Sequence, residues 1–291
     1  MNSGPRISVI IPTFRRTDRL LMTFESVCRQ SLPEAEREII VVNDDPNFES
    51  WPTIARRLRA HEHTLVLESG GRGAAGARNV GAKAARAPLL FFLDDDTILS
   101  PGVLQAHLEA HREDQNRLVH GCVVDLTAFK FAPDTAVLQG ALVGAKGRIL
   151  DLTTSTTLQS DAHRYGARRS FIERQIELVA GNDSYASLRW LFCIGTNTSV
   201  SARVFAEAGG FDEHYGAAWG GEDIELGLRL LANAVMFERI EATAYHVPTA
   251  RRNTDAALRT FWEAVAVRHR SPKLIRIGEF LSGRRQLEEL L

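Results

Sequence analysis

The sequence has few cysteines, no long apolar run and almost no net charge, and each of these shortages excludes a class of protein. Its three cysteines, Cys28, Cys122 and Cys193, are far apart, which suits a reducing cytoplasm better than a disulfide framework or a zinc site. Its longest apolar runs, such as residues 88–93, are far too short to cross a bilayer. With 35 basic and 36 acidic residues the net charge is −1, so general binding of nucleic acid is not expected.

The two ends of the chain carry weaker signals about location. The N-terminal residues run directly into a strand-like segment without a signal peptide, so we expect a cytoplasmic protein. Residues 251–285 contain nine Lys or Arg and three acidic residues, and 9 − 3 leaves a local excess of six positive charges. A solvated helical face would explain this excess, and so would peripheral contact with the inner face of an anionic membrane.

Short apolar runs alternate with helix-like segments over the first hundred residues. Strands that are apolar on both faces are typical of a parallel sheet covered by helices on both sides. We therefore expect an α/β fold with a Rossmann-like, mostly parallel sheet, in which ligands bind at the carboxyl ends of the strands. The predicted strands are residues 7–11, 38–42, 64–67 and 89–93, and the predicted helices are residues 20–30, 51–61 and 77–86.

The remainder of the chain is less regular. Residues 125–190 show no clean periodicity, and the sequence does not divide them into elements. Elsewhere the patterns predict strands over residues 119–124, 195–200 and 237–245, and helices over residues 101–115, 202–208, 222–232 and 254–270.

The strongest chemical signal is the run Asp94-Asp95-Asp96 at the end of the fourth predicted strand. Three adjacent carboxylates repel one another, and a hard cation such as Mg2+ or Mn2+, which prefers one or two carboxylates plus phosphate oxygens, would offset that repulsion. In such a site Asp94 would reach a ribose or a metal-bound water while Asp96 binds the metal. A solvated acidic turn, or the N-cap of the helix predicted over 101–115, would produce the same run.

A second signal is the glycine-rich segment 71–76, which matches G-x-G-x-x-G. Because Asp94 follows near the spacing of a ribose-binding acid, an NAD-dependent oxidoreductase is an alternative interpretation. The segment follows the third predicted strand, however, whereas a dinucleotide site uses the first. A tight turn that lets a nucleotide approach the backbone explains the glycines equally well, with Arg78 next to a base or phosphate.

The segment Trp219-Gly220-Gly221-Glu222-Asp223 and the later His246 complete the candidate residues. Acidic residues in a first helical turn favour the helix dipole, so the pair has a structural explanation. Beside a metal-diphosphate site, Asp223 becomes a candidate general base for a hydroxyl. His246 ends the last predicted strand, where it is either structural or a further ligand for Mn2+.

Together these segments resemble the family 2 glycosyltransferases, which have a GT-A fold. The resemblance spans roughly residues 6–246, and its specificity comes from the order and spacing of the segments. The matching segments are residues 8–14, 40–44, 76–79, 92–96 and 221–223, with residues 195–200 and 209–213 resembling the acceptor side. Two departures are Arg15-Arg16, where the family often has Asn, and residues 43–46, where it usually has Asp-Asp-Gly-Ser.

The resemblance implies a role for each candidate residue. Asp44 would face the base of the nucleotide, and Asp223 would be the general base, with Glu222 orienting the acceptor. The implied nucleotide-binding residues are Pro12, Thr13, Phe14, Asp44, Arg78, Asp94 and Asp95. The implied acceptor-binding residues are Trp219, Gly220 and Gly221, and the implied metal ligands are Asp96, His246 and Asp94.

The resemblance also implies the reaction and the domain arrangement. A single displacement would invert the anomeric carbon of a nucleoside-diphosphate sugar, by default a UDP-sugar, with GDP- and dTDP-sugars open. The acceptor would be a glycan, a lipid-linked glycan, a peptide or a natural product. Residues 1–250 would form the GT-A domain, with a nucleotide-binding half at 6–100 and an acceptor-binding half at 101–250, and residues 251–291 a helical extension. A nucleotidyltransferase and a non-catalytic sugar-nucleotide binder are further alternatives, and a homo-oligomer is compatible with the sequence.

Overall fold

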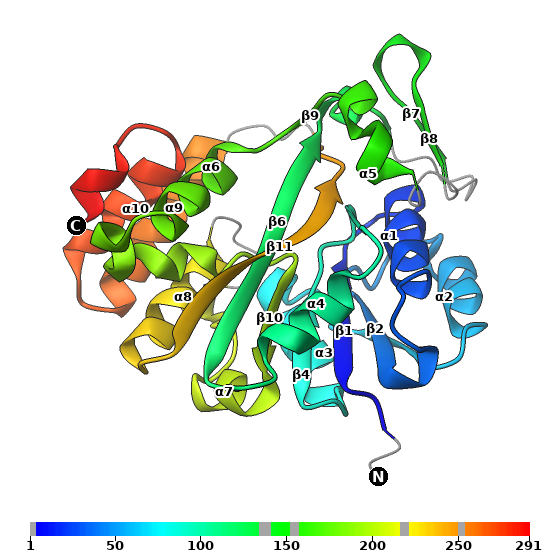
Figure 1. Cartoon of the computed structure of the whole chain (residues 1–291), viewed down its shortest axis with the longest axis horizontal. Helices are drawn as coiled ribbons and strands as arrows, with labels where there is room; N and C mark the ends of the chain where they lie inside the picture. The colour runs from blue at the N-terminus through cyan, green and yellow to red at the C-terminus, as the bar shows by residue number, and fades with distance from the viewer. Residues whose placement is uncertain (1–3, 134–140, 152–156, 216–220, 250–253) are drawn as a thin grey trace.

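A mixed nine-stranded sheet, covered by helices on both faces, forms the centre of the molecule (Figure 1). The computed structural model describes residues 4–133, 141–151, 157–215, 221–249 and 254–291. Within them the strands run in the order β3-β2-β1-β4-β10-β6-β11-β5, and β9 pairs with β6. The strands are β1 Ile7–Thr13, β2 Arg37–Asn43, β3 Thr64–Glu68, β4 Leu89–Phe92, β5 Thr97–Leu99, β6 Arg117–Leu126, β9 Ala167–Arg168, β10 Thr198–Ser201 and β11 Met236–His246.

The first four strands are parallel and apolar on both faces, as the sequence predicts. Successive residues of β1 enter different cores: Val9 packs with one cluster and Ile10 with the other. Helices α1 Asp18–Cys28, α2 Trp51–Arg59 and α3 Gly73–Ala84 connect these strands. The predicted fold class is therefore confirmed, and this half presents the carboxyl ends of its strands to one edge.

Beyond β4 the sheet departs from a simple parallel order. Strand β10 lies antiparallel between β4 and β6, and β11 runs parallel to β6. The short strand β5 follows β4 in sequence but pairs only with β11 in the described sheet, with Thr97 opposite His246. The turn between β4 and β5 therefore carries the three aspartates across the sheet to the end of β11.

Several elements differ from the predicted ones. Helix α3 begins at Gly73, four residues before the predicted start, because a carboxylate from β2 accepts hydrogen bonds from its first amides. Helix α4 is shorter than predicted, at Val103–Ala110, and the three-residue β5 was too short to show a period. The undivided region contains β7 Ala141–Val143, β8 Ile149–Asp151, α5 Leu158–Asp161, β9 and α6 Phe171–Ala180.

The C-terminal part of the described chain is helical and packs into the larger core. After α7 Ala202–Glu207, helices α8 Glu222–Ala232, α9 Thr254–Arg268 and α10 Ile275–Leu281 follow. Buried Phe261, Trp262 and Phe280 belong to the same apolar cluster as Ile10 of β1. None of the helices in the described part of the chain is both long and apolar enough to cross a membrane.

Candidate active site

A cavity of about 380 Å³ opens at the carboxyl ends of β1, β2 and β4. This volume lies within the range of small-molecule sites. It gathers nine of the residues predicted from the sequence and four others. Its lining consists of Pro12, Thr13, Phe14, Arg16, Asp44, Gly73, Ala74, Ala77, Arg78, Asp94, Asp95, Asp96 and Glu222.

Asp44, at the end of β2, holds the glycine-rich segment in place. Its Oδ1 accepts hydrogen bonds from the Ser69 hydroxyl at 2.6 Å and from the Arg72 amide at 2.8 Å, and its Oδ2 accepts one from the Gly73 amide at 2.9 Å. A carboxylate has about four acceptor positions, so one position on Oδ2 is left for a ligand. The start of α3, where a dinucleotide would place its pyrophosphate, already carries this carboxylate, which argues against an NAD site.

The two departures from the family pattern meet at the rim of the cavity. Nε of Arg15 donates to Oδ2 of Asp45 at 2.5 Å, and this ion pair lowers the pKa of Asp45. Arg15 has φ of 54°, a conformation that Asn adopts more readily than Arg. Its guanidinium also lies 5.3 Å from the ring centre of Phe14, which is 54% exposed beside the cavity.

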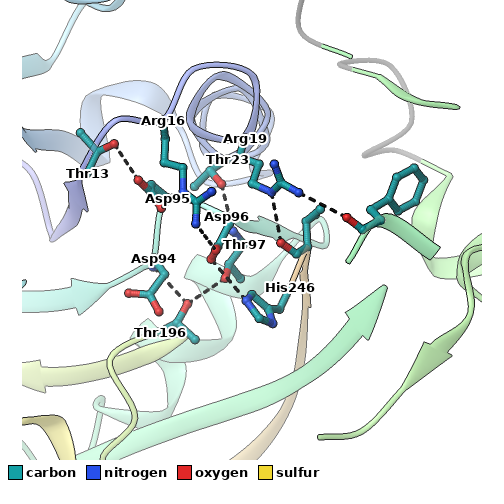
Figure 2. A network of polar contacts seen from close by, with 12 residues as sticks. Thr13, Arg16, Arg19, Thr23, Asp94, Asp95, Asp96, Thr97, Thr196 and His246 are labelled. Carbon is teal, nitrogen blue, oxygen red and sulfur yellow. Dashed lines mark hydrogen bonds and ion pairs between the residues drawn. The ribbon is translucent and has the colours of Figure 1, made fainter. Parts of the chain in front are cut away.

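The three consecutive aspartates point in different directions (Figure 2). Asp95 accepts a 2.6 Å hydrogen bond from the Thr13 hydroxyl. Burial and the neighbouring charge of Asp96 raise the pKa of Asp95 to about 7. Burial also raises the pKa of Asp94, although Arg78 opposes the shift. Bringing these carboxylates together therefore destabilises their ionised forms, and a cation in the cavity would restore them.

Asp96 faces His246 across the junction of β5 and β11. Nε2 of His246 lies 3.5 Å from Oδ1 of Asp96, while its Nδ1 lies 2.8 Å from Oδ1 of Asp125. Burial favours the neutral ring, but the charges of Asp96 and Asp125 outweigh it and raise the pKa of His246 to about 10. The backbone fixes this arrangement, because the Val247 amide donates to the carbonyl of Asp96 at 2.8 Å.

These residues fit a metal that takes few protein ligands. No group of three or more His, Cys, Asp or Glu side chains within the described ranges could by itself hold a metal ion. Mg2+ and Mn2+ bound with a diphosphate need only one or two protein ligands. Asp96 and Nε2 of His246 provide such a pair, and the Asp125 contact fixes the ring as outer carboxylates do at metal sites.

Arg16 adds a positive charge to the same part of the cavity. Its side chain extends from just before α1 towards Asp96 (Figure 2), with NH2 3.8 Å from Oδ2 of Asp96 and Nε 3.9 Å from Oδ1 of Asp95. The buried Arg19, one turn further on, donates to the carbonyls of Val247, Phe129 and Ala132. Helix α1 therefore both presents a cation to the cavity and holds the segment that follows His246.

Arg78 joins the aspartate cluster to the start of α8. Its NH2 donates to Oδ1 of Asp94 at 2.7 Å and its NH1 to Oε1 of Glu222 at 3.0 Å. The guanidinium is buried and lies 5.3 Å from the ring centre of Phe211. Gly195 leaves it room, since a Cβ there would lie 2.4 Å from NH2. Arg78 is thus engaged by two carboxylates.

Asp223 lies next to this bridge and is only partly buried. Its Oδ2 accepts a 2.8 Å hydrogen bond from the Gly195 amide, and its Oδ1 accepts one from the Ile224 amide. Burial and the adjacent charge of Glu222 raise the pKa of Asp223 to about 7, against the opposing charge of Arg78. A carboxylate with this pKa is suited to accept a proton near neutral pH.

The structure therefore brings most of the predicted residues to one edge of the sheet. Asp223, Gly221 and His246 lie beside the cavity lining rather than in it. Trp219 and Gly220 fall outside the described residues. The sequence indicated no role for Arg16 or Asp125; its glycine-rich segment 71–76 indicated a nucleotide near Gly73 and Ala74 but not near Ala77. The last three share one side of α3, a spacing visible only once the helix is known to begin at Gly73.

A GT-A-like sheet with a cavity at the carboxyl ends of its strands, an aspartate cluster and acidic residues opening a helix fits the class of glycosyltransferases. The sequence comparisons agree with this class. Residues 8–130 match the family described as glycosyl transferase family 2, and residues 178–251 match the N-terminal domain of galactosyltransferase. Residues 8–130 therefore belong to glycosyl transferase family 2.

Curated relatives extend the match across most of the chain. Validoxylamine A glucosyltransferase of Streptomyces hygroscopicus subsp. limoneus is 30% identical over 240 residues, covering 79% of this chain and 49% of that protein. Chondroitin synthase of Escherichia coli is 26% identical over 259 residues, covering 86% of this chain and 36% of that protein. The chain thus spans about half the length of the first relative and about a third of the length of the second.

A solved structure gives an independent view of the fold. The crystal structure of S. aureus TarS matches with a TM-score of 0.54 and 15% identity, covering 90% of this chain and 40% of that one. At this level of identity the match shows the GT-A-like fold alone.

Proposed function

We propose that this chain is a hexosyltransferase that moves a sugar from a nucleoside-diphosphate sugar to a hydroxyl acceptor with inversion at the anomeric carbon. The observation that carries the proposal is the arrangement of Asp96, Arg78 and Asp223. Asp96 lies beside His246 at the aspartate cluster. The buried Arg78 connects this cluster to Glu222 at the start of α8, and Asp223, whose pKa is raised, comes next. A donor diphosphate at one end and an acceptor hydroxyl at the other would match this order.

Asp96 and His246 are the proposed ligands of Mn2+ or Mg2+, with Asp94 close to the same ion. When bound, the metal would neutralise negative charge on the leaving diphosphate. Arg16 would contribute positive charge on the same side, because its guanidinium lies within 4 Å of both Asp95 and Asp96. The leaving group therefore departs into a positive environment and needs no protonated side chain.

A uracil base is the proposed partner of Asp44, with Pro12, Thr13 and Phe14 lining the nucleoside pocket. Asp44 has one acceptor position left, on Oδ2, after its three bonds to the glycine-rich segment. Uracil offers a single ring N–H between two carbonyls and needs one acceptor. Guanine offers two adjacent N–H groups and would need both carboxylate oxygens. This difference favours a UDP-sugar over a GDP-sugar.

Asp223 is the proposed general base. It would take the proton of the acceptor hydroxyl while that oxygen attacks the anomeric carbon and the bond to the diphosphate breaks. The Gly195 amide donates to the carboxylate of Asp223, whereas Arg78 donates to that of Glu222. Among the described residues, Asp223 is therefore the member of this acidic pair that has no ion-pair partner at hydrogen-bond distance. A single displacement of this kind inverts the anomeric centre and uses no protein nucleophile.

The proposed acceptor class is drawn from the relatives. One relative is named for validoxylamine A, and others are named for poly(ribitol-phosphate). An acceptor that resembles validoxylamine A or poly(ribitol-phosphate) is the class proposed for this chain. The acceptor would meet the chain near Gly221, directly before α8, and Trp219 and Gly220 are proposed acceptor-binding residues on the sequence alone.

Two variants test the proposal against a nucleotidyltransferase or a non-catalytic binder. Asp96→Ala should abolish the Mn2+-dependent part of UDP binding, measured by calorimetry with and without metal. Asp223→Asn should bind UDP normally but lower the release of UDP from UDP-glucose by about 10²-fold or more. Full activity of Asp223→Asn, or formation of UDP-glucose and pyrophosphate from UTP and glucose 1-phosphate, would contradict the proposed reaction.

A further inference from the structure

Helix α9 lies against the residue that introduces α8. Gly221, with φ of 127°, directly precedes Glu222 and Asp223, and such a conformation is open to glycine but strained for other residues. A Cβ at Gly221 would lie 3.0 Å from Cζ2 and 3.1 Å from Nε1 of Trp262. Trp262 is fully buried. The edge of its indole formed by Nε1, Cε2 and Cζ2 therefore lies against the residue that precedes the helix.

A second glycine, Gly278, packs against the base of the same side chain. A Cβ at Gly278 of α10 would lie 3.0 Å from both Cβ and Cδ1 of Trp262. Trp262 is thus packed between α10 and Gly221, the residue before α8, and a methyl group on either glycine would require the Trp262 side chain to shift by a few tenths of an ångström. Because packed interiors resist displacement, this contact transmits the position of α9 and α10 to α8.

A polar contact also joins the end of α9 to α8, one turn beyond Gly221. Nε2 of His269, just after α9, lies 2.8 Å from Oε1 of Glu225. Glu225 has no exposed surface and also accepts from Nε of Arg229 at 2.9 Å. The first turn of α8 is therefore fixed at Gly221 by an aromatic ring and at Glu225 by a hydrogen bond.

Phe261, the neighbour of Trp262 in α9, packs against Tyr215, which precedes α8 in the sequence. The ring centre of Phe261 lies 4.7 Å from that of Tyr215, and both side chains are buried. Phe261 and Trp262, adjacent in sequence, thus hold Tyr215 and Gly221, the described residues on either side of positions 216–220.

From these contacts we infer that Trp262 is a positioning residue for the transfer reaction, and that α9 and α10 belong to the catalytic unit. The inference rests on the proposed role of Asp223. Gly221 has no side chain with which to cap α8, so the ring of Trp262 supplies the restraint that a capping side chain gives elsewhere. The family matches end at residue 251, before α9 begins.

The magnitude of the expected effect follows from the geometry of general-base catalysis. A shift of about 1 Å in a reacting group lowers the rate by roughly 10²-fold. Loss of the Trp262 contact would let the first turn of α8 move by a fraction of that distance. Trp262 is not among the residues that line the donor cavity, and Glu222 is the one lining residue from α8, so the affinity for the donor should be largely kept.

Trp262→Phe is the test, because phenylalanine lacks the indole atoms against Gly221 but keeps Cβ and a ring atom at the position that faces Gly278. UDP release from UDP-glucose with Mn2+ should show kcat reduced by about tenfold or more, with KM for the donor and Kd for UDP within about twofold. Hydrogen exchange at the Gly195 amide, which donates to Asp223, should become faster. Phe280→Leu is the control, since Phe280 is equally buried in α10 but packs on Phe171.

The outcomes separate this inference from the proposed function. If Trp262→Phe lowers kcat no more than Phe280→Leu while Asp223→Asn is inactive, the positioning role is wrong and the general base stands. If Asp223→Asn is fully active, the proposed function fails first. If Trp262→Phe does not fold, His269→Ala decides: kcat reduced at unchanged KM supports the inference, and an unchanged kcat overturns it.

Discussion

Nδ1 of His246 lies 2.8 Å from Oδ1 of Asp125, across two parallel strands that are neighbours in the sheet. The pairing of β6 with β11 places these residues opposite each other, so the contact is built into the register of the sheet. It leaves Nε2 of His246 directed at Asp96. Asp125 therefore orients a candidate metal ligand and is not itself one of the proposed ligands.

Asp125→Asn should weaken Mn2+ binding by about 10- to 100-fold, the usual cost of losing an outer carboxylate. Calorimetric titration of Mn2+ in the presence of UDP measures this. UDP binding without metal should stay the same in the variant. A Mn2+ affinity equal to that of the wild type would show that His246 does not need this carboxylate.

The pH dependence of turnover should follow the ionisation of Asp223. As a base it must be deprotonated, and its pKa is raised to about 7 by burial and by Glu222. Activity should therefore be low at acidic pH and rise as the pH passes about 7. Profiles of kcat between pH 5 and pH 9 check this, and an acidic limb that falls near the ordinary carboxyl pKa would contradict it.

Glu222→Gln should move that limb to lower pH. The substitution removes the negative charge that raises the pKa of Asp223, while the amide oxygen can still accept from Arg78. Arg78 then acts on Asp223 without a competing carboxylate beside it. The same kcat profile measures the shift, and a movement towards higher pH would mean that another group controls the limb.

Asp44→Ala should lower both stability and nucleotide affinity. Two amides at the start of α3 and the Ser69 hydroxyl lose their acceptor, at a cost of about 1–3 kcal/mol in the free energy of unfolding. Urea unfolding and UDP titration measure the two effects. Ser69→Ala is the control, because it removes one of the three donors and should leave UDP binding nearly unchanged.

Arg15 and Asp45 should couple in a double-mutant cycle. Arg15→Asn relieves a positive φ, and Asp45→Gly removes the carboxylate that pairs with Arg15. Each single change therefore leaves the remaining charged side chain without this ion pair. Because Arg15 is largely exposed, the coupling should be at most about 1 kcal/mol. Thermal unfolding of the four proteins gives this value, and strict additivity would show that the two departures are independent.

The local chemistry of the site was predictable, whereas its long-range contacts were not. Asp44 and Asp94 follow apolar strands, and the carboxyl ends of parallel strands share one edge, so their proximity follows from the strand order. The residue that orients His246 was not predictable, because Asp125 lies on β6, whose pairing with β11 depends on the register of the whole sheet. The role of Trp262 was not predictable either, because an aromatic residue in an amphipathic helix does not indicate which distant glycine it packs against.

The region between β6 and α6 shows a second kind of limit. Its strands β7, β8 and β9 have two or three residues each, so neither a twofold nor a 3.6-residue period can build up along them. Their position depends on packing of buried residues such as Phe129 and Leu142. The sequence correctly predicts the main elements that frame the site and is silent about the short ones between them.

The pairing of β5 with β11 also has a consequence for the order in which the chain acquires its site. Asp96 leaves the ribosome about half of the chain length before His246 does. Strands β1 to β4 are close in sequence, and apart from Glu222 the cavity is lined by residues between Pro12 and Asp96. The partner of Asp96 arrives only with β11, after a long loop has been closed. A nascent chain would therefore form most of the cavity first and the Asp96–His246 pair last.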